Sequence, residues 1–262
     1  MKAKKSLGQN FLINDTIINQ IVSLFVSKKD DLIIEIGPGR GALTSKLVKK
    51  EGTLKCIELD TDLKRYLEKY NSEKCQIIFQ DILKINLEEL LDKKYNNIYV
   101  IGNLPYYITS PIIEKLIKSK IKFNEMFFMV QKEVADRFSA IPGSKDYGYM
   151  SVFINHYYHV TTEIFVGRNN FNPVPKVDSA VIKLKNINDK NYLEDDEKYF
   201  SFIKECFLLK RKTLKNNLKN YDFKIINSIL KKYNYEENIR AEYLPEEVFI
   251  SLYQSLIKNN KQ

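Results

Sequence analysis

The chain has 262 residues, 44% of them apolar, which is enough to bury one large core and a smaller second one and excludes a disordered protein. Its 42 Lys and Arg outnumber its 33 Asp and Glu and give a formal charge of +9. This charge favours a polyanionic partner such as nucleic acid but does not require one.

The N-terminal 26 residues combine a basic head with an apolar stretch, as a signal peptide does. Polar side chains interrupt the apolar stretch at helical spacing, namely Asn14, Asp15, Asn19 and Gln20. We therefore predict an amphipathic helix here. No apolar run approaches the ~20 residues that span a bilayer, so we expect a soluble protein without a membrane partner.

From residue 32 to about 185, short apolar runs alternate with segments of helical period, which predicts a mostly parallel sheet with helices on both faces. No helix-length segment separates the last two runs, so they are expected to pair as an antiparallel hairpin at one edge. The seven predicted strands read LIIEIG, LKCIEL, CQIIFQ, NNIYVIGN, EMFFMVQ, TEIFVG and SAVIKLK. The helices predicted between them read GALTSKLVKK, TDLKRYLEKY, LEELLDKK and SPIIEKLIKS.

Strand signals stop after Lys185, where an acidic, polar stretch is typical of a linker. Three amphipathic helical segments follow, at 199–220, 223–233 and 245–258. We therefore expect two domains, an α/β domain of residues 1–185 and a small all-helical domain of residues 186–262.

A glycine-rich turn joins the first predicted strand to a helix and contains Gly37, Gly39 and Gly41. Glycines let a ligand approach the backbone, and a helix that begins at such a turn offers free amides. Glu58, 21 residues after Gly37, ends the second strand, where a carboxylate accepts both hydroxyls of a ribose. Asp81 ends the third strand, within reach of an adenine amine. Together these residues predict one nucleotide-binding crevice.

The turn and the acids fit NAD and S-adenosylmethionine (SAM) alike. The spacing G-x-G-x-G, in place of the pyrophosphate-binding G-x-G-x-x-G, favours SAM. With SAM as the cofactor, the predicted fold is the Rossmann-like class I SAM-dependent methyltransferase fold, followed by the helical domain.

Residues 103–106, NLPY, decide the choice of cofactor. An exocyclic amine on a base is a poor nucleophile, because its lone pair is delocalised into the ring. The Asn103 side-chain oxygen and the Leu104 carbonyl, kept extended by Pro105, are suited to accept the two amine hydrogens and aim the lone pair at a methyl sulfonium. Tyr106 is expected to stack on a purine turned out of its helix. No general base is needed, since the proton becomes acidic only after methyl transfer.

Neither the histidines nor the cysteines predict a metal site. His156 and His159 lie three residues apart with no Cys or carboxylate beside them in the sequence, so we expect packed or surface side chains. Cys56, Cys75 and Cys206 are odd in number and widely spaced, which predicts reduced thiols in an intracellular protein.

The chain closely resembles the KsgA-type ribosomal RNA adenine dimethyltransferases, which are related to the Erm methyltransferases. The resemblance extends over nearly the whole length in ordered blocks: KKSLGQNFL, EIGPGRGALT, IELD, QDIL, GNLPYYITSPII, MVQKEVADR, SKDYGYMSV and FNPVPKVDSAVIKL. The position after Tyr106 is often Asn in the family and is Tyr107 here. We assign no catalytic role to it.

The resemblance implies a role for individual residues. Asn10 and Leu12 would contact SAM, as would Gly37, Gly39, Glu58 and Asp81, and Asn103 would lie between the cofactor and the target. Phe171 corresponds to an aromatic residue that helps to hold the flipped base, so the base would lie between Tyr106 and Phe171. The alternative for Phe171 is a core phenylalanine before a P-x-P loop.

The tail resembles the KsgA type rather than the Erm type in its segments FLLKRKTLKNNL and RAEYLPEEVF. It would present a basic helix to RNA phosphates, and the basic residues are Lys210, Arg211, Lys212, Lys215 and Lys219. The alternative is an ordinary solvated face.

The expected activity is SAM-dependent dimethylation of N6 on two adjacent adenosines in the 3′-terminal hairpin of small-subunit (16S) rRNA. The expected partner is the small ribosomal subunit or its precursor particle, recognised by a monomer in the cytoplasm, or in an organelle if the host is eukaryotic. Three alternatives are an Erm-type enzyme acting on large-subunit (23S) rRNA, a non-catalytic assembly or transcription factor with the same fold, and a DNA adenine methyltransferase. Intact NLPY and Glu58 disfavour the non-catalytic alternative, and the tail disfavours the DNA enzyme.

Overall fold

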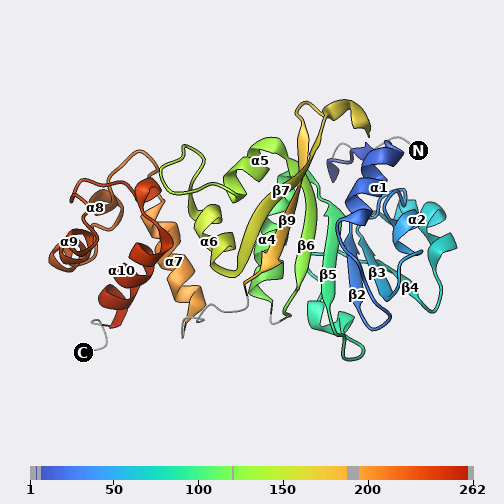
Figure 1. Ribbon diagram of the computed structural model, residues 1–262, viewed down its shortest axis with the longest axis horizontal. Helices are drawn as coiled ribbons and strands as arrows, with labels where there is room; N and C mark the ends of the chain where they lie inside the picture. The colour runs from blue at the N-terminus through green and yellow to red at the C-terminus, as the bar shows by residue number, and fades with distance from the viewer. Residues whose placement is uncertain (1–3, 5–6, 120, 188–194, 259–262) are drawn as a thin grey trace. The chain divides into compact units, whose positions relative to one another are not determined.

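The computed structural model describes residues 4, 7–119, 121–187 and 195–258 (Figure 1). The chain forms two compact units, of which the first comprises Met1–Ala135 and His159–Asn186. The second unit comprises Asp136–Tyr158 and Ile187–Gln262. The expected limits 1–185 and 186–262 place their boundary next to the crossing at residue 186, but they assign Asp136–Tyr158 to the α/β part.

A seven-stranded sheet forms the first unit (Figure 1). Its strand order is β4-β3-β2-β5-β6-β9-β7. The strands are β2 Leu32–Ile36, β3 Thr53–Glu58, β4 Cys75–Phe79, β5 Ile98–Asn103, β6 Glu125–Gln131, β7 Tyr158–Val166 and β9 Ser179–Asn186. All seven predicted strands are present, and the predicted mostly parallel sheet is confirmed.

The strand order shows that the antiparallel strand is β9, which lies between β6 and the edge strand β7. The pairs β3/β4, β2/β3, β2/β5 and β5/β6 are parallel, whereas β6 and β9 are antiparallel. The predicted hairpin partners β7 and β9 are hydrogen-bonded neighbours, with β7 at the edge of the sheet and β9 one place in. The carboxyl ends of β2 to β5 therefore meet along one edge of the sheet.

Both faces of the sheet are buried, as the apolar runs predict. On one face, a core cluster joins alternate strand residues such as Ile33, Ile101 and Phe127 to α1 (Asp15–Ser23) and α2 (Thr44–Leu47). The intervening strand residues, such as Ile34 and Val100, are also fully buried, so a second layer covers the opposite face. The remaining helices of this unit are α3 Lys64–Leu67 and α4 Thr109–Lys118, and α5 Lys132–Phe138 crosses the boundary between the units.

Several of the helices that join the strands are shorter than the sequence predicted. Residues 61–70 combine a 3-10 turn, the four-residue α3 and a second 3-10 turn, while the predicted helix at 87–94 is only a 3-10 turn, Leu87–Leu90. Neither α2 nor α3 has a side-chain hydrogen bond at its N-cap. Such short helices depend on packing against the sheet and not on intrinsic helix stability.

The N-terminal segment is only partly helical. Asn14 caps α1 by accepting hydrogen bonds from the amides of Thr16 and Ile17, so the predicted amphipathic helix begins at Asp15. Before it, β1 (Phe11–Leu12) pairs antiparallel with β8 (Phe171–Asn172) in a two-stranded sheet. This pairing was not predicted, because two-residue strands have no sequence signature.

The second unit is helical. Its helices are α6 Tyr149–Tyr157, α7 Asp196–Cys206, α8 Leu214–Asn217, α9 Phe223–Lys232 and α10 Glu246–Lys258. The prediction of one continuous helix over 199–220 is wrong, because α7 ends at Cys206 and residues 207–213 form turns. None of the helices in the described part of the chain is long and apolar enough to cross a membrane.

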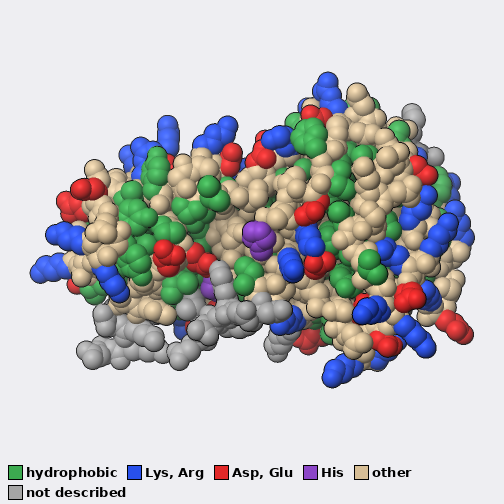
Figure 2. All heavy atoms as spheres, in the orientation of Figure 1, with side chains coloured by type: hydrophobic (Ala, Val, Ile, Leu, Met, Phe, Trp, Pro, Cys, Tyr) green, Lys and Arg blue, Asp and Glu red, His purple; other side chains and the backbone are tan. Residues whose placement is uncertain are grey.

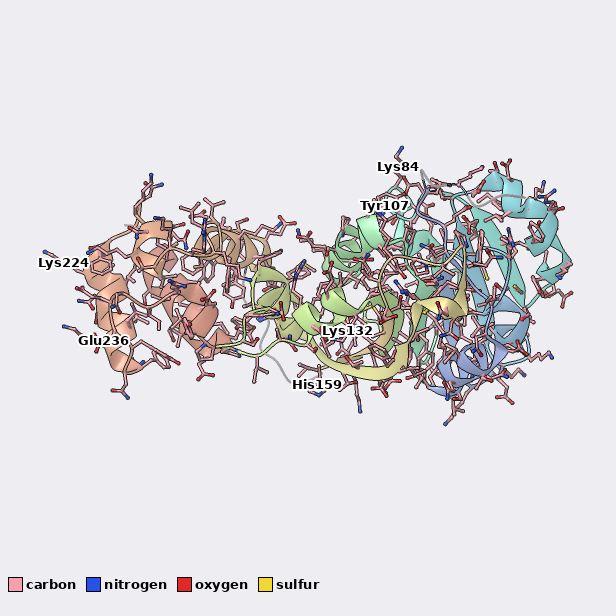
Figure 3. All side chains as sticks on the ribbon, turned by 90° about the horizontal axis from the view of Figure 1, so that it is seen from above. Lys84, Tyr107, Lys132, His159, Lys224 and Glu236 are labelled. Carbon is pink, nitrogen blue, oxygen red and sulfur yellow. The ribbon has the colours of Figure 1, made fainter. Side chains whose placement is uncertain are left out.

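The two histidines lie in different surroundings. His159 is exposed at the surface (Figure 3). His156 is buried in the second unit, where its Nδ1 contacts the Glu246 carboxylate and its ring packs against Tyr199 and Phe200. The fold thus supplies a carboxylate partner from a helix 90 residues away in the chain, and His156 is a packed core histidine.

A buried carboxylate connects β2 to the helix that follows it. Glu35 is 1% exposed and accepts hydrogen bonds from the Thr44 hydroxyl at 2.7 Å and the Cys56 thiol at 3.4 Å. Desolvation raises the pKa of Glu35 to about 7, against the hydrogen bonds that lower it. Since Thr44 begins α2, Glu35 fixes both ends of the glycine-rich turn between them.

We expect Gly102→Ala to destabilise the first unit. A Cβ on Gly102 would lie 2.5 Å from the backbone oxygen of Ile36, so β2 and β5 would have to separate. Overpacking of this kind lowers the free energy of unfolding by about 2 kcal/mol. Thermal unfolding of the variant should show a fall of several degrees in Tm.

The matched control is Gly167→Ala, because Gly167 has φ −62° and its added Cβ would only contact Asn170 at 3.7 Å. Equal Tm values for the two variants would contradict the prediction.

Glu35→Gln should remove a pH dependence of stability. The unfolded carboxyl loses its proton near 4.5 and the folded one near 7, so the stability that the protonated form contributes is complete below pH 4.5 and declines as pH rises to 7. In urea unfolding between pH 5 and pH 8, the free energy of unfolding of the variant should rise relative to that of the wild type by up to about 3 kcal/mol. Parallel pH profiles of the two proteins would show that Glu35 titrates normally.

Candidate active site

A cleft open to solvent lies at the carboxyl ends of β2, β3, β4 and β5, and its empty space is about 800 Å³ when the solvent at its open side is included. The N-terminal segment 7–11 forms one of its walls. Strand ends in a doubly wound sheet are the usual place for a nucleotide. The predicted residues that line this cleft are Asn10, Gly37, Gly39, Glu58, Asp81, Asn103, Leu104, Pro105 and Tyr106.

The glycine-rich turn adopts a conformation that other residues resist. Gly37 and Gly39 have φ values of 68° and 60°, in the left-handed region. A Cβ on Gly39 would approach the Phe11 ring to 3.2 Å. The turn therefore exposes backbone to the cleft and lies directly against the N-terminal segment.

Glu58, the last residue of β3, is hydrogen-bonded to the glycine-rich turn that follows β2. Its Oε2 accepts a hydrogen bond from the Gly39 amide at 3.0 Å, and its Oε1 accepts one from the Asp60 amide at 2.8 Å. Burial raises the pKa of Glu58, while the two amides act in the opposite direction by stabilising its charge. Each carboxylate oxygen has a second lone pair, so the group can still accept the two hydroxyls of a ribose.

The part of the cleft beyond Glu58 is suited to a flat base. Asp81 follows β4, and its Oδ1 accepts a hydrogen bond from the Leu83 amide. This bond leaves the other carboxylate oxygen available to an amine donor. Apolar side chains also line the cleft, among them Ile57, Leu59, Leu63, Ile82 and Ile112.

Asn103 ends β5 and faces the same cleft. Its Nδ2 donates a hydrogen bond to the backbone oxygen of Asn10 at 2.9 Å. With the amide nitrogen committed in this way, the Oδ1 atom is the acceptor available to a ligand. The next residue, Leu104, is buried and its amide donates to Met129 O, which fixes the strand end against β6.

Tyr106 begins a 3-10 turn and lies half-buried at the cleft. Its hydroxyl shares a 2.7 Å hydrogen bond with Ser179 of β9. Burial raises the pKa of Tyr106, so the phenol is neutral at physiological pH. Its neighbour Tyr107 is 57% exposed and also lines the cleft (Figure 3).

Two predicted residues occupy other positions. Phe171 does not line the cleft: it is 1% exposed and belongs to the core cluster with Leu12 and Phe127. The prediction that Phe171 lies opposite Tyr106 is therefore wrong, because the ring of Phe171 packs in the core. Leu12 lines an adjoining hollow that Gly37, Gly39 and Asn103 also line.

The predicted basic residues lie in the second unit and are exposed. Lys210, Arg211 and Lys212 are in the turns after α7, and only Lys215 lies on α8. The prediction that one helix presents them is therefore wrong. On the face drawn in Figure 2, Lys and Arg side chains are interspersed with Asp and Glu over both units, so the net charge is not gathered in one field there.

Sequence reasoning missed the residues that hold the N-terminal segment at the cleft. The Arg40 guanidinium lies over the Phe11 ring at 4.3 Å, and Gln9 and Lys4 bond to Asp60. Lys4 and Gln9 lie in the block KKSLGQNFL, and Asp60 lies in the block IELD. Nothing in the sequence pairs Gln9 with Asp60, because they are 51 residues apart.

The residues of the cleft fit SAM. Glu58 offers acceptors for a ribose, Asp81 and the apolar side chains suit an adenine, and the glycine turn leaves space for the remainder of the cofactor. Asn103 lines the same cleft, so a methyl acceptor held by its amide would meet the cofactor there.

Comparisons with known proteins agree with this site. The family model described as ribosomal RNA adenine dimethylase matches residues 1–258. Ribosomal RNA small subunit methyltransferase A of Ureaplasma urealyticum is 42% identical over 98% of this chain and 94% of the relative. The crystal structure of a dimethyladenosine transferase from Plasmodium falciparum has a TM-score of 0.77 at 26% identity and covers 96% of this chain and 98% of that one.

The structure of the 23S rRNA methyltransferase ErmE has a TM-score of 0.70 at 22% identity and covers 95% of this chain and 100% of that one. This likeness concerns the fold alone. The family resemblance inferred from the sequence is confirmed over the length of the chain, together with the class I SAM-dependent methyltransferase fold. The chain therefore belongs to the ribosomal RNA adenine dimethylase family.

Proposed function

We propose that the protein uses SAM to dimethylate N6 of two adjacent adenosines in the 3′-terminal hairpin of 16S rRNA. The observation that carries this proposal is the position of Asn103, whose free acceptor oxygen faces the cleft that Glu58 and the glycine turn form. The relatives named for the small subunit favour this substrate over the 23S rRNA of the Erm alternative.

The chemistry follows from the two acceptors at the end of β5. SAM supplies an electrophilic methyl group on a sulfonium. The Asn103 Oδ1 atom accepts one hydrogen of the target amine and the Leu104 carbonyl accepts the other, so the nitrogen lone pair turns out of the ring plane. Pro105, with φ −59° and ψ 127°, keeps the chain extended after Leu104. The proton leaves after the methyl group has bonded, which requires no base in the protein.

Tyr106 stacks on the flipped adenine, because its ring is held at the cleft by the bond to Ser179. Phe171 supports the site from below the surface by packing on Leu12, beside the strand that carries Asn10. A second methylation requires the site to accept N6-methyladenine. We therefore infer that the site has room for that methyl group on one side of Asn103.

The second unit supplies contacts to RNA phosphates through Lys210, Arg211, Lys212 and Lys215, with Lys219 beside them. We assign the catalytic role to residues 1–185 and RNA binding to residues 186–262. We infer that the natural substrate is a small-subunit precursor particle, bound by one copy of the protein in the cytoplasm, or in an organelle of a eukaryotic host. Shape and phosphate contacts dominate such recognition.

Methylation of separated ribosomal subunits tests the substrate. Unmethylated small subunits, large subunits and a duplex DNA are each incubated with the protein and labelled SAM, and label should appear only in the small subunit. Mapping should find N6,N6-dimethyladenosine at two adjacent positions of the 3′-terminal hairpin. Label confined to the large subunit would establish the Erm alternative, label in duplex DNA would establish the DNA alternative, and no label in any substrate would favour the non-catalytic one.

Asn103→Ala tests the acceptor role of the amide. The variant loses the oxygen that orients the amine, so the single-turnover rate at saturating SAM should fall by at least about a hundredfold. The control is Asn86→Ala, which removes an amide that caps a 3-10 turn outside the cleft and should leave the rate unchanged. An undiminished rate in Asn103→Ala would refute the proposed chemistry.

A further inference from the structure

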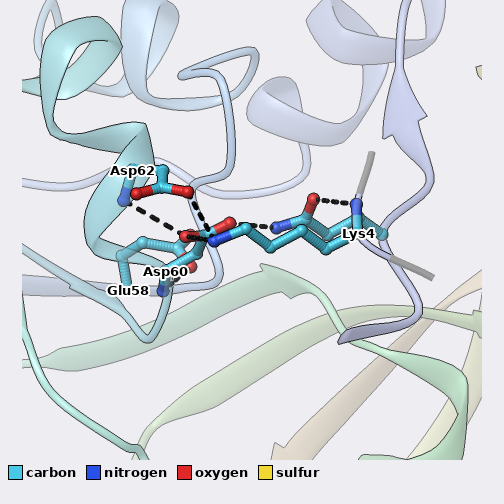
Figure 4. A network of polar contacts seen from close by, with 5 residues as sticks. Lys4, Glu58, Asp60 and Asp62 are labelled. Atoms are coloured by element: carbon cyan, nitrogen blue, oxygen red, sulfur yellow. Dashed lines mark hydrogen bonds and ion pairs between the residues drawn. The ribbon is translucent and has the colours of Figure 1, made fainter. Parts of the chain in front are cut away.

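The N-terminal segment is fastened to the turn after β3 by a cluster of polar contacts (Figure 4). Lys4 Nζ lies 2.6 Å from Asp60 Oδ1, and Gln9 Nε2 donates to Asp60 Oδ2 at 2.8 Å. The Gln9 side-chain oxygen accepts a hydrogen bond from the Lys4 amide at 2.9 Å. We call Lys4, Gln9 and Asp60 the clasp, and residues 7–12 the strap.

Asp60 is the fixed part of the clasp. Its side chain is 1% exposed, whereas that of Asp62, the other carboxylate bonded to Lys4, is 62% exposed. Burial alone would raise the pKa of Asp60, but the hydrogen bonds from Lys4, Gln9 and the Asp62 amide, together with the Lys4 charge, hold the pKa below its ordinary value. Asp60 Oδ2 is paired with Gln9, and Oδ1 is shared between Lys4 and the Asp62 amide, so the N-terminal segment supplies a partner to each oxygen where water has little access.

The strap is held at its other end by a separate set of bonds. Leu12 and Phe11 pair with β8, and Asn14 Nδ2 donates to Asn170 Oδ1 at 2.7 Å. Between the two fastenings lies Asn10, whose side chain donates to Gly8 O. The backbone oxygen of Asn10 is consequently fixed in position, and it is this atom that receives the hydrogen bond from Asn103 Nδ2.

This last bond determines which atom of the Asn103 amide faces the target. An amide that rotates by half a turn would present a donor to the amine hydrogens in place of an acceptor. The Asn10 oxygen prevents the rotation, because only a nitrogen can donate to it. The strap therefore holds the Asn103 amide in the orientation that the proposed chemistry uses.

We propose that Gln9 and Asp60 are positioning residues for methyl transfer: the clasp holds the strap across the cofactor cleft and, through the Asn10 oxygen, orients the Asn103 amide. The inference rests on the proposed function only in the role of Asn103. Its structural part, that the clasp fixes the strap, stands independently.

The clasp is also connected to the cofactor side of the cleft. The Asp60 amide donates to Glu58 Oε1, so the carboxylate proposed to hold the ribose and the carboxylate that holds the strap share one turn of backbone. Weakening the clasp should therefore affect cofactor affinity as well as rate. A merely stabilising cluster would change neither property of the folded enzyme.

Asp60→Asn and Asp62→Asn form a matched pair to test this proposal. Both substitutions remove one negative charge beside Lys4, but only Asp60 contacts Gln9. Asn is also an effective N-cap, so the bond from the Asp62 amide to residue 60 is retained. The single-turnover rate on small subunits and the KM for SAM are measured for both variants. We expect Asp60→Asn to lower the saturating rate about tenfold and to raise the KM several-fold, with both values unchanged in Asp62→Asn.

Hydrogen exchange of the full-length variants supplies a readout that does not depend on catalysis. Amides of residues 7–13 should exchange faster in Asp60→Asn than in Asp62→Asn, whereas those of β5 should not differ. Gln9→Ala should reproduce the effects of Asp60→Asn, and it replaces that variant if Asp60→Asn does not fold.

The two proposals fail in different ways. Equal kinetics and equal exchange in the clasp variants and Asp62→Asn, with Asn103→Ala inactive, would overturn the clasp and leave the proposed function intact. Faster exchange in the clasp variants with an unimpaired Asn103→Ala would overturn the acceptor role of Asn103 and limit the clasp to holding the strap. Faster exchange with unchanged kinetics would overturn the positioning role.

Discussion

The site depends on a buried carboxylate at the end of β3. Glu58 accepts one amide from the glycine turn after β2 and one from the turn after β3, and so holds two neighbouring strand ends in register. A carboxylate remains charged in a buried position only if donors such as these bond to it. Backbone amides can do so only where the two turns direct their N–H groups at the carboxylate. The left-handed glycines and the placement of Asp60 both serve this requirement. The same group that organises the turn is therefore the one available to a ribose.

Parallel strands explain why the remaining functional groups share the cleft. The carboxyl ends of β2, β3, β4 and β5 lie along one edge, and each contributes a polar residue or a turn there. The N-terminal strap completes the cleft from outside the sheet. Its contact with Asn103 joins the segment that precedes β1 to the strand that carries the proposed chemistry. The fold alone does not identify the substrate, since an Erm-type structure shares it.

Much of the fold was predictable, because buried parallel strands are continuous apolar runs and their ends carry recognisable polar residues. All seven strands and the long helices α4, α9 and α10 were found in this way. The failures are short or irregular segments. The turns at 207–213 were read as a helix because their lysines and leucines are good helix formers, whereas the loop conformation depends on tertiary contacts such as Lys210 to Lys145 O. The helices α5 and α6, which follow β6, were not predicted at all.

The amino-acid sequence by itself determined the family, the sheet, and the identities of the residues that line the cleft, since these depend on local patterns and on ordered motifs. Only the tertiary structure decided which of those residues meet. It placed Phe171 in the core, gave His156 a partner from α10, and brought Gln9 to Asp60 and Asn10 to Asn103. Contacts between residues far apart in the chain depend on how the strands and turns pack in three dimensions. No local pattern in the sequence contains that information.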